Sequence, residues 1–142
     1  MKILVIEDDT DIREALVFLL ESEGYEVAAA ENGKAALDLL SQGRNPELIL
    51  VDLFMPVMDG LTFRKKQLGR PEIAKIPVIL MSADWINAGV YKVSEDALDA
   101  SGKPKPKYYA CISRLVKRAA LSLLRLATYW NDLDQSNFWA DF

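Results

Sequence analysis

The sequence predicts an α/β fold in which helices cover both faces of a parallel sheet. Four short apolar runs alternate with segments of helical periodicity, a pattern typical of right-handed βαβ units. Three of the runs end on polar residues, at the edge of the sheet where ligands of open parallel sheets bind. A length of 142 residues suits a single domain.

The first half of the chain supplies two strands and two helices. Residues 2–6 are predicted to be a strand buried on both faces, and residues 25–29 a second strand. A helix begins between them at a cap formed by Thr10 or Asp9 and ends before Gly24, and Asn32 opens the next helix. The side chains expected to face the core are those of Ile12, Ala15, Leu16, Leu19, Leu20, Ala35, Ala36, Leu39 and Leu40.

Two more strands and a helix follow. Residues 48–51 form a third apolar run that ends on Asp52, and residues 60–68 are helix-like. Residues 77–81 form the fourth run, which is followed by Ser82.

The pattern weakens beyond the fourth run. Residues 108–130 form one long helical candidate with a wide apolar face. We therefore expect a domain over residues 1–128, with a clear pattern through residue 83 and an atypical one over 84–128. Residues 129–142 are acidic and aromatic, and we expect them to form a tail.

Composition excludes several classes of function. The net charge of −4 argues against direct binding to nucleic acid or to an anionic membrane. The chain has no histidine and one cysteine, which excludes a His/Cys zinc site and histidine acid–base catalysis. No apolar run is long enough to cross a membrane, and the start MKILVIEDD becomes acidic too early for a signal peptide. A cytoplasmic protein is the expectation.

Carboxylates gather where the predicted strands end. Glu7, Asp8 and Asp9 follow the first strand, Asp52 ends the third, and Ser82 follows the fourth. Helix capping is the simpler interpretation for Asp9 alone. Glu7, Asp8 and Asp52 together are better explained by a hard cation such as Mg²⁺, because converging carboxylates repel one another. An aspartate beside Mg²⁺ can take up a phosphoryl group, which a hydroxyl and a lysine can then contact.

Three stretches, ILVIEDDTDIR, NPELILVDLFMPVMDG and IPVILMSA, resemble the receiver domain of two-component response regulators. The match is close and ordered through about residue 83. It implies a doubly wound, flavodoxin-like parallel sheet with strand order 2-1-3-4-5. It also implies signal transfer, in which a histidine kinase or phosphotransfer protein phosphorylates the domain, and the domain changes conformation to control a downstream protein target.

The resemblance gives individual roles to the residues at the ends of the first and third strands. Asp52 is implied as the phosphoacceptor. The implied Mg²⁺ ligands are Asp8 directly, Glu7 through water, Asp52 itself and the backbone carbonyl of Phe54.

The same resemblance implies the groups that contact the phosphoryl group. Ser82 is the implied switch hydroxyl, and Ala83 is the small residue that leaves the phosphate room to enter. The contacting lysine is Lys103 or Lys105, because each precedes a proline at close to the usual distance. The apolar spacing of the helical stretch that follows favours Lys105.

The fifth strand is missing from the sequence pattern. Residues 94–102, SEDALDASG, contain no β-branched run. Residues 90–93 are strand-like but follow residue 83 too closely for a parallel crossover. We therefore expect a fifth strand that is short, absent or contributed by a partner chain. The apolar stretch over 108–130 allows a homodimer, as the alternative to a terminal helix packed on the sheet.

Three functions are compatible with these observations. The first is a phosphoacceptor receiver, a signalling module rather than an enzyme, for which slow self-dephosphorylation is allowed. The second is a receiver-like interaction module that works without phosphorylation, which the missing fifth-strand pattern motivates. The third is a phosphohydrolase with an aspartyl nucleophile. Such enzymes usually place a second aspartate two residues after the nucleophile, where this chain has Phe54.

Overall fold

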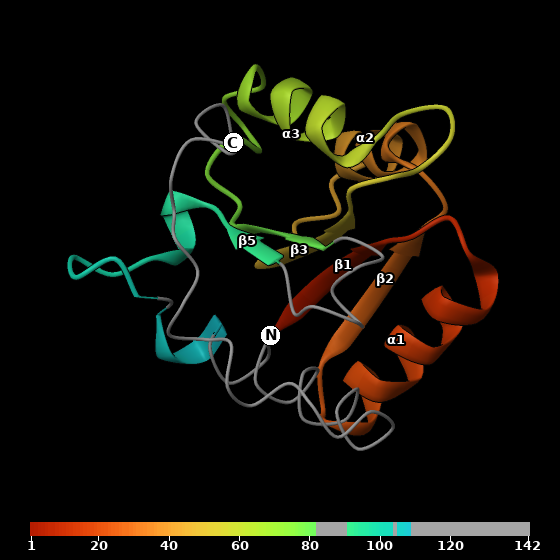
Figure 1. The fold of residues 1–142 in the computed structure, drawn as a ribbon, viewed down its shortest axis with the longest axis horizontal. Helices are drawn as coiled ribbons and strands as arrows, with labels where there is room; N and C mark the ends of the chain where they lie inside the picture. Colours follow the sequence, from red (N-terminus) through yellow and green to blue (C-terminus); the bar gives the residue numbers. More distant parts are fainter. Residues whose placement is uncertain (82–90, 104, 109–142) are drawn as a thin grey trace.

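Five strands form a single sheet in the order β2-β1-β3-β4-β5 in the computed structural model, which describes residues 1–81, 91–103 and 105–108 (Figure 1). The first four strands are parallel to one another, as predicted. The strands are β1 (Lys2–Ile6), β2 (Glu26–Ala30), β3 (Leu48–Asp52), β4 (Val78–Met81) and β5 (Tyr91–Val93).

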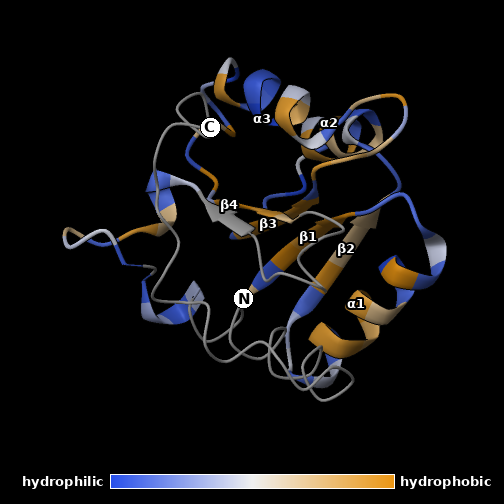
Figure 2. Cartoon of the chain, in the orientation of Figure 1, coloured by the Kyte–Doolittle hydropathy of each residue, from blue (hydrophilic) through white to orange (hydrophobic). Residues whose placement is uncertain are grey.

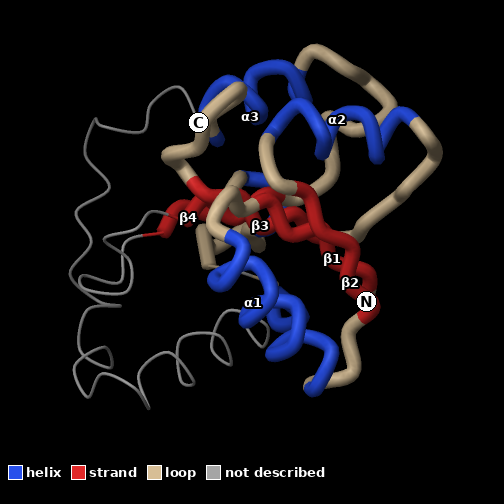
Figure 3. Tube along the Cα trace, turned by 90° about the vertical axis from the view of Figure 1, so that its right-hand side faces the viewer, coloured by secondary structure: helices blue, strands red, loops and turns tan. Residues whose placement is uncertain are grey.

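Helices cover both faces of this sheet. Helix α1 (Thr10–Ser22) lies on one face, and α2 (Gly33–Ser41) and α3 (Gly60–Leu68) lie together on the other (Figures 1 and 3). The predicted three-layer α/β arrangement is thereby confirmed for the described residues. The bounds of α3 agree with the predicted helix over residues 60–68.

The core is divided by the sheet, because successive side chains of a strand point to opposite faces. The central strands are therefore apolar almost throughout, and Figure 2 shows them mostly in orange. One cluster packs under α2 and α3 and includes Leu4, Ile6, Ile49, Val51, Val78, Leu80, Ala36, Leu40 and Phe63. The other lies on the α1 side and includes Ile3, Val5, Leu48, Leu50, Ile79, Met81, Leu16 and Leu20.

Each of the three helices begins at a side-chain cap. Asp9 Oδ1 accepts a hydrogen bond from the backbone N–H of Ile12 at 2.9 Å, which selects Asp9 over Thr10 as the cap of α1. Asn32 caps α2 as predicted, and Asp59 caps α3. A side-chain cap of this kind contributes about 1 kcal/mol to stability. The caps fix where each helix leaves the edge of the sheet at which the parallel strands end.

The fifth strand differs from the sequence expectation in its direction. β5 occupies the predicted fifth position but pairs antiparallel with β4, with Tyr91 opposite Met81 and Val93 opposite Ile79. The expectation of an entirely parallel sheet is therefore wrong at this strand, and the strand comes from the chain itself. The physical reason is chain length, because residues 82–90 are too few for a parallel crossover of about a dozen residues or more.

Several predictions lie outside the described residues. They concern the long helix over 108–130, the tail over 129–142, and the homodimer that the apolar face of that helix allows.

A short 3₁₀ helix, η1 (Glu95–Ala97), follows β5. None of the helices in the described part of the chain is long and apolar enough to span a bilayer.

Candidate metal centre

Three carboxylates converge where β1 and β3 end. Glu7 and Asp8 follow β1, and Asp52 is the last residue of the neighbouring β3. One oxygen atom from each of the three side chains lies within 4.8 Å of the other two. Glu7 and Asp52 are 6% and 7% exposed, whereas Asp8 is open to solvent. The structure thus brings together the three acids that the sequence singled out.

Burial of these acids works against their ionisation. It is the largest cause that raises the pKa of Glu7 to about 7, against the lowering effect of a hydrogen bond from the Asp9 backbone N–H. The charges of Asp52 and Asp8 raise the pKa of Glu7 further. Burial likewise raises the pKa of Asp52 to about 6, with an additional contribution from Asp8. Desolvation of Glu7 and Asp52, together with repulsion among the three carboxylates, therefore destabilises the metal-free site.

The cluster has the chemistry of a site for a hard divalent cation. Its ligand atoms are oxygens, which Mg²⁺ prefers, and its carboxylates gain from a neutralising charge. Oxygens that share one Mg²⁺ ion lie about 3–4 Å apart, given metal–oxygen distances of about 2.1 Å. The oxygens of Glu7, Asp8 and Asp52 need only a small inward movement to reach that separation. The residues present therefore fit Mg²⁺.

Arg13 fixes the backbone that carries Glu7 and Asp8. From the first turn of α1, its Nη1 donates to the carbonyl oxygen of Glu7 at 2.8 Å and to that of Asp8 at 3.1 Å. Arg13 was not among the residues predicted from the sequence. The sequence signal that could have identified Arg13 is its position, six residues after Glu7 and in the first turn of the helix that follows the acidic pair.

The loop after β3 is shaped by a tight turn and a glycine. Val57 has a positive φ of 69°, and Met58 N donates to the carbonyl of Pro56 at 2.7 Å across it. Gly60 N donates to the carbonyl of Leu53 at 3.0 Å. These contacts bring the start of α3 against the end of β3, beside Asp52.

The remaining residues expected on this side of the site are placed only in part. Phe54 lies in the loop after β3 with its side chain 68% exposed, and the role of its carbonyl as a ligand stays a prediction. Ser82 and Ala83 lie outside the described residues, directly after Met81 in the chain. Met81 is the partner of Asp52 in the sheet.

The structure does not bring Lys105 to the acidic cluster. Lys105 Nζ donates to the carbonyl of Asp96 at 2.9 Å, and its N–H donates to that of Ala97. Because β5 is antiparallel, these residues lie beyond the amino end of β4, opposite to the edge where Asp52 lies. Lys103 is exposed in the preceding turn. A lysine at this spacing reaches the acidic edge when the fifth strand is parallel, whereas β5 is antiparallel.

Comparisons with known proteins place these features in one family. The model of the response regulator receiver domain matches residues 3–103. The two-component response regulator ORR3 of Oryza sativa subsp. indica is 31% identical over 119 residues, which make up 84% of this chain and 90% of that protein.

Solved structures agree with this result. The signal receiver domain of a signal transduction histidine kinase from Syntrophus aciditrophicus is 30% identical with a TM-score of 0.57, over 89% of this chain and 95% of that one. The chemotaxis protein CheY4 of Vibrio cholerae is 32% identical with a TM-score of 0.52, over 56% of this chain and 65% of that one. The match of sequence, sheet order and acidic edge shows that this chain belongs to the response regulator receiver domain family.

Proposed function

We propose that this domain accepts a phosphoryl group on Asp52 from a histidine kinase or phosphotransfer protein, and that the modification controls a downstream protein target. The observation that carries the proposal is the convergence of Glu7, Asp8 and Asp52 at one edge of a receiver-type sheet. In the proposal, Mg²⁺ would be held by Asp8, Asp52 and the carbonyl of Phe54 directly, and by Glu7 through water.

The geometry favours Asp52 as the acceptor among the three acids. Asp52 ends a central strand and is buried, so its position is fixed by the sheet on both sides. The pKa of Asp52, raised to about 6 by burial, leaves this carboxyl mostly ionised at neutral pH, as a nucleophile must be. Asp8 is exposed, so its side chain is free to move toward a cation that binds at the site.

The proposed reaction is a simple group transfer. A carboxylate oxygen of Asp52 attacks the phosphorus atom of a phosphohistidine, the phosphorus–nitrogen bond breaks, and the imidazole leaves with the electron pair and takes a proton. A Mg²⁺ ion held at the carboxylates of Glu7, Asp8 and Asp52 would supply positive charge opposite the phosphoryl oxygens. In the proposal, Ser82 then contacts the phosphoryl group and Ala83 leaves room for it.

Phosphorylation by a small donor tests the proposal without a partner protein. With acetyl phosphate and Mg²⁺, we expect the intact mass of the wild-type protein to increase by one phosphoryl group that is stable in acid and labile in base. Asp52→Asn is expected to remain unmodified. Asp9→Asn is the matched control, because it removes a nearby charge while asparagine still caps α1. Equal labelling of Asp52→Asn and wild type would remove Asp52 from the proposal.

Binding of Mg²⁺ is expected to weaken as the pH falls. The cation requires ionised carboxylates, and burial raises the pKa of Glu7 to about 7 and that of Asp52 to about 6. Protons therefore compete with the metal over this range, and we expect the association constant to fall at least about tenfold between pH 8 and pH 6. Calorimetric titration with MgCl₂ measures the change. A constant that does not vary over that range would contradict the assignment of these ligands.

A phosphorylation-independent interaction module is the second candidate. The observation that favours it is the position of Lys105, which lies far from the acidic edge and bonds to the Asp96 carbonyl. If the second candidate is correct, partner binding is the same for wild type and Asp52→Asn, with or without acetyl phosphate.

A further inference from the structure

The fifth strand is short for an element that closes the edge of a sheet. β5 contains three residues, and strands this short form few backbone hydrogen bonds. Ser94 extends the pairing, since its N–H donates to the Val78 carbonyl at 2.8 Å and its Oγ accepts from the Val78 N–H at 2.9 Å. These bonds attach only the first residue after β5 to the amino end of β4.

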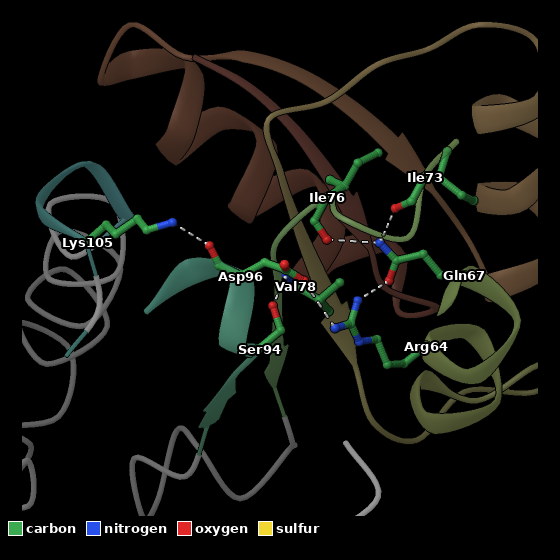
Figure 4. A network of polar contacts seen from close by, with 8 residues as sticks. All are labelled: Arg64, Gln67, Ile73, Ile76, Val78, Ser94, Asp96 and Lys105. Carbon is green, nitrogen blue, oxygen red and sulfur yellow. Dashed lines mark hydrogen bonds and ion pairs between the residues drawn. The ribbon is translucent and has the colours of Figure 1, made fainter. Parts of the chain in front are cut away.

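A buried arginine on α3 supplies a further attachment. Arg64 is 4% exposed, and its Nη2 lies 3.7 Å from Oδ2 of Asp96 in η1 (Figure 4). Burial lowers the pKa of Arg64, and the neighbouring Asp96 raises it. A guanidinium group stays charged in a protein, so its burial depends on a nearby carboxylate. The pair joins the helix that follows the Asp52 loop to the segment that follows β5.

Gln67 holds the guanidinium group of Arg64 in place. Arg64 Nη1 donates to Gln67 Oε1 at 2.7 Å, and Gln67 Nε2 donates to the carbonyls of Ile73 and Ile76 at 2.9 Å each (Figure 4). Gln67 is fully buried. The arginine is therefore anchored on α3 and on the loop that leads into β4, and Asp96 is the more exposed partner of the ion pair.

Asp96 also contacts Lys105, which lies further along the chain. Its carbonyl accepts from Lys105 Nζ at 2.9 Å, and the Lys105 N–H donates to the carbonyl of Ala97 at 2.8 Å. Ala97 is buried in the core on the α1 side of the sheet. Asp96 thus contacts Arg64 of α3 through its side chain and Lys105 through its backbone carbonyl.

We propose that Arg64 and Asp96 form a clasp that holds η1 and Lys105 on the edge of β4, and that this segment opens as a unit when the pair is broken. Arg64 lies on α3, four residues after Gly60. The N–H of Gly60 donates to the carbonyl of Leu53, the residue that follows Asp52. The clasp goes beyond the proposed function and does not depend on phosphorylation of Asp52.

Hydrogen exchange of the unmodified protein tests the clasp. The reporters are the amide protons of Val78, Ser94, Ala97 and Lys105, each of which donates a hydrogen bond within the segment or between the segment and β4. In Asp96→Asn we expect these protons to exchange at least about tenfold faster than in wild type, because the buried guanidinium of Arg64 loses the carboxylate charge of Asp96. Amides of β1 and β3 are expected to keep their wild-type rates. Glu95→Gln is the control on the same 3₁₀ helix, since it removes an exposed charge that acts on Arg64 more weakly than that of Asp96.

Two further results decide the proposal. Arg64→Met/Asp96→Asn is expected to exchange no faster at the reporters than the faster of the two single variants, because both substitutions remove the same interaction. The clasp is overturned if Asp96→Asn exchanges like Glu95→Gln at the reporters. It is also overturned if Asp96→Asn accelerates β1, β3 and the reporters equally, because the segment then opens only with the whole domain.

Discussion

Replacement of Asp52 by asparagine is expected to make the metal-free protein more stable at pH 8, by about 1–3 kcal/mol. Folding moves this carboxylate into a buried position beside Asp8, and the pKa rises from 3.8 to about 6. Asparagine has nearly the same shape, carries no charge, and can still accept hydrogen bonds from the backbone N–H groups that face residue 52. The loss of stability in the wild type is the cost of holding an ionised carboxylate where Mg²⁺ is proposed to bind.

The dependence of this effect on pH follows from the direction of the shift. Since the folded state holds the proton of Asp52 more tightly, wild-type stability falls as the pH rises through about 4 to 6, and the loss is complete above that range. The difference between the two proteins should therefore close below pH 4. Urea unfolding at pH 4 and pH 8 without metal measures the difference in free energy of unfolding between wild type and Asp52→Asn, with Asp9→Asn as the control. An Asp52→Asn protein less stable than wild type at pH 8 would contradict this electrostatic account.

Replacement of Gly60 by alanine is expected to destabilise the fold by about 2–4 kcal/mol. A Cβ atom at this position would lie 2.4 Å from the Asp52 carbonyl oxygen and 2.8 Å from Cδ1 of Leu80. The carbonyl belongs to the backbone of a central strand, so it cannot move without disturbing the sheet. The first turn of α3 would have to shift away from β3, which also weakens the bond from Gly60 N to Leu53.

Gly69→Ala is the matched control for this substitution. Gly69 caps the other end of the same helix with a φ of −74°, and a Cβ there would meet only the Lys66 and Lys65 carbonyls, at 3.5 and 3.8 Å. Its effect on the free energy of unfolding is expected to be below about 1 kcal/mol. Chemical denaturation of the two variants compares them directly. Similar stability of Gly60→Ala and Gly69→Ala would show that the close approach of α3 to β3 is not required.

The first part of the fold was predictable because its residues obey simple periodicities. Strands buried on both faces produce continuous apolar runs such as residues 2–6 and 48–51, and the helices between them carry their own caps. Glu7, Asp8 and Asp52 were predictable as a cluster for the same reason, because parallel strands bring their carboxyl ends to one edge.

The direction of β5 could not be read from residue types. Residues 90–93 are strand-like in the sequence, but the direction of their pairing is determined by the length of the chain that precedes them. Lys105 lies away from the acidic edge for the same reason, since a residue that follows the fifth strand reaches that edge only when the strand is parallel. Arg64 and Gln67 were also missed, because a polar pair within a helix ordinarily faces solvent and only the tertiary structure shows its burial.

The most direct test of the account is to locate the phosphoryl group on the chain. After reaction with acetyl phosphate and Mg²⁺, borohydride reduces an aspartyl phosphate to homoserine, and peptide mass spectrometry then identifies the altered residue. We predict a single modified position, Asp52, and no modification when Mg²⁺ is removed by a chelator. Modification at Glu7, Asp8 or any other carboxylate in place of Asp52 would contradict the account.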